Sequence, residues 1–580
     1  MGDNKVSDIY QGGYSSFKPT YGDVFTGYRI NPASLGLTTD PRTANIIKDA
    51  SSKLNTGAKH IELSAVTPEV FESIPNEQLK EVNRLSKLIG TTVSVHGPIV
   101  ELSGMGKDGF SESNRIGAER QMLSAVERSH IVNPTGNVPV TFHSSAGLSE
   151  HIPLKGKGPE ETIIINKESG SIHRLPLIER HFPGEEGEKD VKREIDKLNE
   201  EQWLSNLRQL EARSEIGKES IEKSFQTNLL ADAEKKAGKS ITPEEKDAQF
   251  EFNRGVIALN DSYNTMKQLF EIASSYSSDV EKNKIKDYYR DIDEKARRIK
   301  DNPNDVKHNS LLMKEIIENG VKTLEEVKPK LFENLNDFSK EKTIQTISNV
   351  ALASYKKFGN TAPIISIENP PAGAAFARGE DLKDIVERAR QQFVEKAVKN
   401  GMSEKEAKDS AKKLIGVTWD VGHINMIRKY GYDSEDIIKE TEKIAPLVKH
   451  VHLSDNFGFE HTELPMGMGN VPIKEIMDKL GKEGFDAKKI IEAGNWWQHM
   501  QTPPFKETLE AFGSPIYGMN MAPYWNQSLG GQQDYYGGYG MMLPQTNYET
   551  FGSGFSRLPS ELGGQRAGAE GSRMSGKGME

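Results

Sequence analysis

The sequence predicts an α/β protein whose main part is a (β/α)8 (TIM) barrel, interrupted by one long, mainly helical insertion. Eight short β-type runs alternate with longer amphipathic stretches, which is the pattern of parallel βαβ units. Eight such units fit a closed barrel. The spacing breaks once, after the fourth run, where far more chain follows than one βα connection requires.

The first half of the barrel is expected before residue 150. The amphipathic stretches 44–54 and 75–88 predict the helices that follow its first two strands. Its four strands are predicted, from runs of β-branched and other apolar residues, at 28–35, 60–65, 92–96 and 138–143.

The second half is expected after residue 341, and it repeats the same alternation. An open, doubly wound sheet is built from the same units and is the rival architecture. The strands are predicted at 363–368, 414–420, 448–453 and 489–492, with helices at 382–398, 434–444 and 473–481.

The insertion begins with two β-type runs, at 162–165 and 172–175, which predict a hairpin around the turn residues 167–170. From 188 to about 340 the chain is charged and poor in Gly and Pro, and its apolar residues have helical spacing. This pattern predicts two to four long helices. A solvated arm is the simpler interpretation, and a lid or an arm that binds a protein partner is the functional alternative.

Composition separates the termini from the barrel and excludes several kinds of chemistry. The absence of cysteine excludes disulfides, thiolate metal sites and Cys nucleophiles. Residues 1–10 lack an apolar leader, and no apolar run reaches the roughly 20 residues of a membrane span, so we expect a cytoplasmic protein without membrane contact. The net charge of −10 gives no general attraction to nucleic acid.

We divide the chain into five parts by composition and pattern. They are a flexible arm (1–22), the first barrel half (23–150), the insertion (151–340), the second barrel half (341–513) and a Gly-, Tyr- and Met-rich tail predicted to be disordered (514–580).

Six predicted strands carry a His, Asp or Glu at or near their carboxyl ends, and in a parallel barrel these ends converge on one face. Three carboxylates at one focus repel each other unless a cation neutralises them. A mixture of imidazole and carboxylate ligands suits Zn, Mn, Fe or Co. The sequence therefore predicts a metal site built from His96, His143, Glu368, Asp420, His452 and Glu492.

This ordered set resembles the xylose-isomerase-like barrel superfamily, which includes endonuclease IV and the sugar isomerases and epimerases. The resemblance covers roughly residues 25–145 and 345–510, and the endonuclease IV pattern is the closer match. It implies two or three zinc ions. The first would be bound by His96, His143 and Glu368, and the second by Glu368, Asp420, His452 and Glu492.

A third zinc ion is implied by His423 and by His461, which lies in the loop after the seventh strand. The family places an Asp two residues before this second His, but Phe459 stands at that position here. Glu460 or Glu463 could substitute for the Asp, and otherwise the third metal would be weak or absent.

The resemblance implies phosphodiester hydrolysis on DNA that contains abasic sites, with Glu368 and Glu492 as the catalytic carboxylates. The alternative is a sugar isomerase or epimerase with one Mn²⁺ or Co²⁺ held by Glu368, Asp420, His452 and Glu492. In that family the two glutamates act as acid and base on a small sugar. A non-catalytic barrel that serves as a scaffold is the third possibility.

Overall fold

The computed structural model describes residues 34–150, 152–181, 187–225, 242–494, 496, 500 and 502–512. It divides the chain into two compact units, one formed by the residues up to Lys157 together with those from Ser339 onward, and one formed by Gly158–Phe338. The predicted N-terminal arm at 1–22 and the predicted tail at 514–580 lie outside the described residues.

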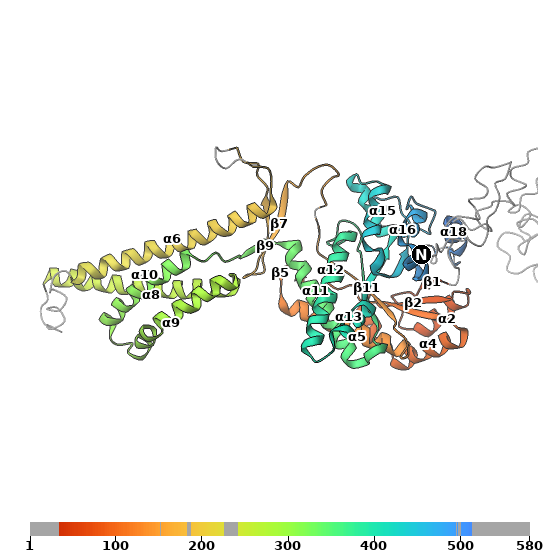
Figure 1. Cartoon of the computed structure of the whole chain (residues 1–580), viewed down its shortest axis with the longest axis horizontal. Coiled ribbons are helices and arrows are strands. Elements are labelled where there is room, and N and C mark those ends of the chain that lie inside the picture. The colour runs from red at the N-terminus through yellow and green to blue at the C-terminus, as the bar shows by residue number, and fades with distance from the viewer. Residues whose placement is uncertain are drawn as a thin grey trace, which may run out of the picture. The chain divides into compact units, whose positions relative to one another are not determined.

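The first unit contains a closed barrel of eight parallel strands, which confirms the predicted fold (Figure 1). Each strand pairs with the strand of the next βα unit, and β13 pairs with β1 to close the ring. The strands are β1 (Leu35–Thr38), β2 (His60–Ser64), β3 (Thr92–His96), β6 (Pro139–His143), β10 (Ile364–Glu368), β11 (Ile415–Asp420), β12 (Val448–Leu453) and β13 (Lys488–Ile491).

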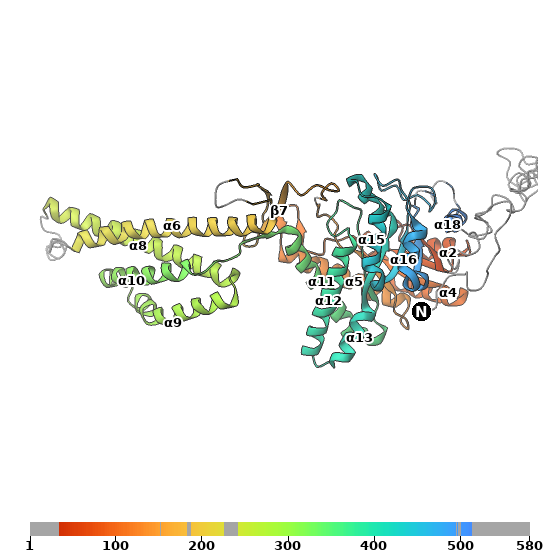
Figure 2. The ribbon, with the colours of Figure 1, turned by 45° about the horizontal axis from the view of Figure 1, so that its top comes forward.

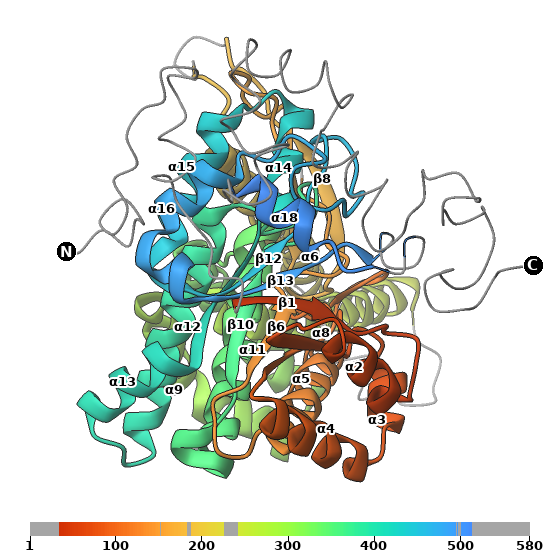
Figure 3. The same cartoon turned by 90° about the vertical axis from the view of Figure 1, so that its right-hand side faces the viewer.

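Helices surround this barrel on its outside, as Figure 3 shows for α2, α4, α12 and α16. They bury an apolar face against outward-pointing strand residues such as Val95, Phe142 and Trp419. The helices are α2 (Ile46–Leu54), α3 (Pro68–Ser73), α4 (Asn76–Ile89), α5 (Glu112–Val132), α11 (Leu335–Phe358), α12 (Gly379–Lys399), α13 (Glu404–Leu414), α14 (Val421–Asn425), α15 (Ser434–Ile444), α16 (Ile473–Asp486) and α18 (Phe505–Ala511).

Five shorter elements complete the connections of this unit in the part of the chain that is described. Two-residue strands form a small hairpin in the loop between β3 and α5, and 3-10 turns lie beside longer elements. These are β4 (Met105–Gly106), β5 (Gly109–Phe110), η3 (Gly359–Thr361), η4 (Met426–Tyr430) and η5 (Ala445–Leu447).

The first strand is the one strand whose predicted position is wrong. It occupies Leu35–Thr38, so the predicted range 28–35 overlaps it at a single residue. The reason is close packing against the two neighbouring strands. Gly36 pairs with His60 and Ile490 in the neighbouring strands, and a Cβ atom at this position would lie 2.7 Å from the His60 carbonyl oxygen and 2.8 Å from the Ile490 side chain. The strand therefore requires a glycine, a residue that β-propensity counts against.

The interior of the barrel is polar at two successive levels. Parallel strands alternate their side chains, so residues two apart in one strand share a face. The upper level holds the strand-end residues His96, Glu368, Asp420 and His452. The level below holds Ser94, Ser366, Thr418 and His450, all fully buried. This composition differs from the branched apolar residues that usually fill such barrels.

The second unit combines a small antiparallel sheet with four helices in the part of the chain that is described (Figure 2). The predicted hairpin is present, and a short strand from the end of the insertion joins it as a third member. The elements are β7 (Glu161–Asn166), β8 (Ile172–Pro176), β9 (Phe332–Asn334), α6 (Val191–Phe225), α8 (Pro243–Tyr276), α9 (Asp279–Asp301) and α10 (Val306–Glu325).

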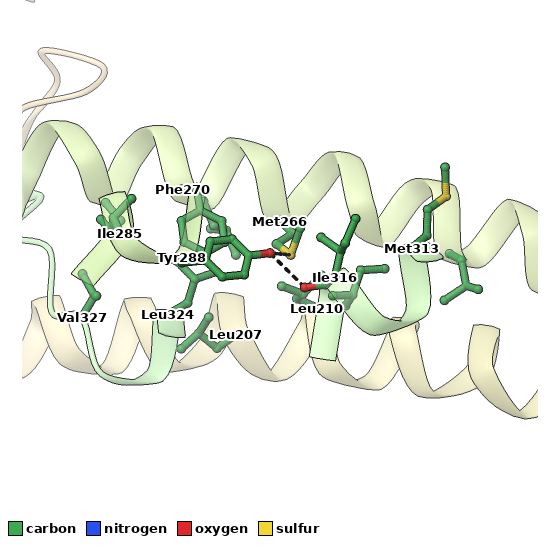
Figure 4. Close-up of a cluster of buried hydrophobic side chains, with 14 of the residues drawn as sticks. Leu207, Leu210, Met266, Phe270, Ile285, Tyr288, Met313, Ile316, Leu324 and Val327 are labelled. Carbon is green, nitrogen blue, oxygen red and sulfur yellow. Dashed lines mark hydrogen bonds between the residues drawn. The ribbon is translucent and has the colours of Figure 1, made fainter. Parts of the chain in front are cut away.

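The helices of this unit share an apolar core, part of which Figure 4 shows. Its aromatic centre is Tyr288, which stacks on Phe270 with ring centroids 4.5 Å apart. The Tyr288 hydroxyl is buried and donates a hydrogen bond to the Ile316 carbonyl oxygen at 2.9 Å, so the ring adds packing without leaving a polar atom unsatisfied. Capping boxes at Thr242 and Ser278 begin α8 and α9.

No helix within the described ranges combines the length and the apolar stretch needed to cross a bilayer.

Candidate metal centre

Glu368, at the end of β10, lies at the centre of the strand-end residues. Its Oε2 atom is 3.3 Å from His96 Nε2 and 3.2 Å from His143 Nε2. Its Oε1 atom is 2.7 Å from His452 Nδ1, on the other side. The two oxygens of one carboxylate therefore face two separate sets of imidazoles.

A second group of ligand atoms shares Glu368. His452 Nδ1 is also 3.1 Å from Glu492 Oε1, which follows β13. One ligand atom from each of Glu368, Asp420, His452 and Glu492 lies within 4.8 Å of the others, and the same holds for His96, His143 and Glu368. The six strand-end residues thus form two overlapping groups, each with the donors and spacing that one metal ion requires.

Asp420 is held in place by the helix that it begins. Its Oδ1 atom accepts hydrogen bonds from the backbone N–H groups of Gly422 and His423, at 2.7 and 2.8 Å, and caps α14. The Ser454 hydroxyl donates to the same oxygen. Gly422 permits this arrangement, because a Cβ atom there would lie 2.1 Å from Ser454 Oγ. Oδ2 of Asp420 is left free to face the cluster.

His423 and His461 meet at the rim of the centre. His423 Nδ1 lies 2.7 Å from the Asn369 carbonyl oxygen, so this nitrogen donates and Nε2 is left with its lone pair. That Nε2 atom is 2.9 Å from His461 Nε2. Glu463 Oε1 is 3.7 Å from His461 Nε2, whereas Phe459 and Glu460 are exposed. Of the two glutamates considered for the missing Asp, Glu463 is the one with a contact to this pair.

The charges within the cluster compensate one another only in part. Burial raises the pKa of Asp420 well above its ordinary value, and the neighbouring charges of Glu492 and Glu368 act in the same direction. Burial also acts to raise the pKa of Glu368, but the charges of His452 and His143 outweigh it and lower that pKa. For His96, burial is outweighed by contact with Glu368, and its pKa rises to about 9. The protonated imidazoles therefore supply positive charge that a metal ion could supply instead.

These residues fit a divalent metal. Oε2 of Glu368 and Oδ2 of Asp420 are buried and accept no hydrogen bond, which is costly for a carboxylate oxygen unless a cation lies beside it. The donor set of imidazoles and carboxylates, with no thiolate, matches Zn²⁺, Mn²⁺ or Co²⁺.

A cavity of about 480 Å³ opens onto the cluster. Its lining includes ligand candidates from both groups, the loop that follows β1, and Lys53 from α2. The volume is that of a pocket for a small ligand or for one extruded nucleotide unit. The lining includes His96, His143, His423, His461, Glu463, Glu492, Thr39, Arg42 and Lys53.

Sequence reasoning missed Glu62, a fully buried carboxylate in β2. Its Oε1 atom lies 3.2 Å from His452 Nε2, on the opposite edge of that ring from Glu368. The predicted ligands stand at the ends of strands, whereas Glu62 stands two residues before the end of β2. A charged residue in the middle of an otherwise buried strand is itself a signal that could have identified it.

Comparisons with known proteins agree with the barrel. Residues 361–512 match the family model described as xylose isomerase-like TIM barrel. An uncharacterized protein from Methanocaldococcus jannaschii is 32% identical over 88 residues, which are 15% of this chain and 29% of that protein. The chain thus matches less than a third of the length of this curated relative.

Solved structures that resemble the chain include a D-tagatose 3-epimerase-like protein, with 12% identity, coverage of 83% of this chain and 98% of that one, and a TM-score of 0.34. Another is D-psicose 3-epimerase with D-tagatose from Clostridium cellulolyticum H10, with 9% identity, the same two coverages and a TM-score of 0.36. The closed ring of eight parallel strands is a TIM barrel, and the second half of this barrel is similar to the xylose isomerase-like family over residues 361–512.

Proposed function

We propose that this protein is a metal-dependent phosphodiester hydrolase of the endonuclease IV type, acting on DNA at abasic sites. The observation that carries the proposal is the position of Glu368, whose two oxygens face different imidazoles, His96 and His143 on one side and His452 on the other. A carboxylate with this arrangement is suited to bridge two metal ions. A single-metal enzyme gives His96 and His143 no such role.

In this proposal His96, His143 and Glu368 hold one zinc ion, and Glu368, Asp420, His452 and Glu492 hold a second. His423 and His461, with Glu463 in place of the family's Asp, would hold a third. Clustered divalent cations lower the pKa of a bound water, orient a phosphate and stabilise the leaving oxygen.

The residues of the chain then have separate tasks. Glu368 fixes the spacing of the two ligand groups. Glu492 lines the cavity, and its side chain is 15% exposed, so its carboxylate can orient an attacking water and accept its proton. Arg42 and Lys53 also line the cavity and can contact an anionic substrate.

The cavity favours an extruded sugar–phosphate unit over an intact stack of bases. Enzymes that act inside a duplex turn the target nucleotide out into a pocket, and an abasic site has no base to unstack. The volume of about 480 Å³ is compatible with one such unit. The net charge of −10 means that attraction to DNA depends on local cations such as Arg42 and Lys53.

A sugar isomerase or epimerase is the second candidate. Glu368, Asp420, His452 and Glu492 by themselves form a complete four-ligand group for one Mn²⁺ or Co²⁺ ion. The two glutamates would exchange a proton at a sugar carbon, and His423 would contact a hydroxyl group. This reading leaves His143 and His461 without a task, although both line the cavity.

The test combines metal content with one substitution. We expect two or three zinc ions per chain by elemental mass spectrometry, and cleavage of an abasic-site duplex that falls at least 100-fold in His143→Ala. His173→Ala, which removes an exposed histidine of β8, is the matched control and should keep full activity.

Other results would change the assignment. Full cleavage by His143→Ala contradicts the hydrolase proposal. One ion per chain, with conversion of a ketohexose that survives the same substitution, supports the epimerase. Failure to bind any metal on titration supports a non-catalytic scaffold.

A further inference from the structure

Beneath the proposed metal ligands lies a second set of polar residues that the proposed reaction does not use. Glu62 is at its centre and is 0% exposed. It pairs in register with Ser94 on β3, two residues before His96. From β12, His450 lies two residues before His452 and faces the same interior. These three side chains form a layer directly below the ligands.

The contacts of Glu62 divide between its two oxygens. Oε2 accepts hydrogen bonds from Ser94 Oγ at 2.7 Å and from His450 Nε2 at 3.1 Å. Oε1 lies 3.2 Å from His452 Nε2, and neither of these two atoms has a hydrogen-bond partner within the described residues. A small rotation of either side chain would align this pair as a hydrogen bond.

The opposite edge of the His452 ring faces the metal ligands. Nδ1 lies 2.7 Å from Glu368 and 3.1 Å from Glu492. In a neutral imidazole one nitrogen carries the proton and the other has a free lone pair, and the hydrogen bond at one nitrogen decides the role of the other. A proton held at Nε2 by Glu62 leaves Nδ1 as the ligand.

A chain of hydrogen bonds keeps Glu62 in its orientation. Ser94 has one hydroxyl proton, which it donates to Glu62, so it accepts from His60 Nε2 at 3.1 Å. His60 Nδ1 then accepts from Thr92 Oγ1 at 2.6 Å. Every donor in this series of hydrogen bonds points toward the Glu62 carboxylate. This direction favours the charged form of Glu62.

A separate metal ion bound by Glu62, His450 and His452 is the alternative explanation of the same cluster. One observation disfavours it. Glu62 Oε2 already accepts hydrogen bonds from two donors, Ser94 and His450. We therefore interpret the contacts of Glu62 as hydrogen bonds and not as those of a metal ligand.

We propose that Glu62 is a positioning residue of the metal centre, which accepts a hydrogen bond from His452 Nε2 and presents His452 Nδ1 to the metal. This inference rests on the proposed function for the existence of the metal. It adds that β2, which supplies no ligand, controls the affinity of the site. Residues that orient a ligating histidine typically change metal affinity by about 10–100-fold when replaced.

The test is metal affinity in Glu62→Gln, which keeps the side-chain shape and removes the charge. We expect the Kd for Zn²⁺, measured by competition with a chelator, to rise about 10–100-fold. The visible absorption of the Co²⁺-loaded protein should change as well, because the orientation of one ligand changes. The matched control is Glu440→Gln, a buried carboxylate of α15 that pairs with Arg378 and Lys443. It should lower stability and leave the Kd unchanged.

The outcomes separate this inference from the proposed function. Wild-type protein that binds no Zn²⁺ overturns both. Wild-type protein that binds tightly, with Glu62→Gln within about twofold of it, overturns only the role of Glu62. If Glu62→Gln does not fold, Ser94→Ala takes its place, since it removes the shortest hydrogen bond to Glu62. It is expected to weaken Zn²⁺ binding several-fold, and an unchanged Kd contradicts the proposal.

Discussion

At the scale of single residues, the proposed centre is a site where protons and a metal ion compete. Burial acts to lower the pKa of His96 and of His452, but the neighbouring carboxylates outweigh it. The pKa of both rings is therefore raised, that of His96 to about 9. A metal ion binds the neutral imidazole, so binding must displace these protons.

We predict that Zn²⁺ binding at pH 7 releases more than one proton per chain. The affinity should increase with pH through about pH 9, where His96 loses its proton in the metal-free protein. Calorimetric titrations in buffers with different ionisation enthalpies measure the number released. An enthalpy that does not depend on the buffer contradicts the prediction.

Glu463 and Glu460 form a matched pair for the third metal. Glu463 lies 3.7 Å from His461 and lines the cavity, whereas Glu460 is exposed. If three zinc ions are bound, Glu463→Gln should reduce the content by one ion per chain and Glu460→Gln should not. Equal metal content in the two variants removes Glu463 from the ligand set.

At the scale of secondary-structure elements, hydrogen bonds connect the loops that follow β6 and β10. The backbone N–H of Glu150 donates to the Gly373 carbonyl oxygen, and its carboxylate accepts from the Phe376 backbone N–H at 3.2 Å. Phe376 has a φ of 63°, which is rare for a residue of this size, and it is fully buried. Burial, with a smaller contribution from the charge of Asp381, raises the pKa of Glu150 to about 7.

This pKa predicts how stability depends on pH. Because the folded protein holds the Glu150 proton up to about pH 7, stability is lost as pH rises from about 4.5 through 7. Glu150→Gln cannot ionise and avoids this loss. We expect it to match the wild type at pH 5 and to exceed it at pH 8 by up to about 3 kcal/mol in urea unfolding. A constant difference between the two proteins at both pH values contradicts the assignment.

Two helical glycines should respond to alanine in opposite directions. A Cβ atom at Gly320, in α10, would lie 2.3 Å from Met266 Sδ and 2.7 Å from the Tyr288 hydroxyl oxygen. Gly117, in α5, has open space around the same position. We expect Gly320→Ala to destabilise its unit by about 1–3 kcal/mol through overpacking. Gly117→Ala should stabilise its unit by about 0.5–1 kcal/mol, because alanine is the better helix former. Unfolding in urea checks both signs.

At the scale of the whole molecule, the proposed metal ligands all belong to one of the two units. We therefore expect metal binding to stabilise the barrel and to leave the insertion unaffected. We predict that removal of the metal with a chelator speeds amide hydrogen exchange in β3, β10 and β12. Exchange in α6 and α8 should not change. Uniform loss of protection in both units would mean that the metal lies elsewhere or that the units are coupled.

The sequence alone predicts the position of a strand well where the alternation of its side chains and the residues at its end indicate the same boundaries. The strands at 92–96 and 448–453 have the predicted boundaries, and the eighth strand is shifted by one residue. Gly36 obscured the first strand because its role lies in a tertiary contact. The short strand β9 was not predicted, since its pairing with β7 depends on residues more than a hundred positions away.

The candidate site was predictable as a set of residues that share one face, and the structure brings the eight predicted ligand residues to one end of the barrel. Which carboxylate could stand in for the family's Asp depended on the path of the loop around Glu463, and no sequence pattern fixes that path. The position of Glu62 beneath His452 likewise depends on the stagger between β2 and β12, which only the closed ring establishes.

The insertion also affects when the two halves of the barrel can pair during synthesis on the ribosome. The strands β1, β2, β3 and β6 emerge first, and their outer edges are later covered by β13 and β10. Neither partner exists until the whole segment Gly158–Phe338 has been translated. At a synthesis rate of about 5–20 residues per second this delay is roughly 10–40 s. The half-made barrel must keep two open edges from pairing with other chains during that time, so the nascent protein has a period of vulnerability that a barrel without the insertion would not have.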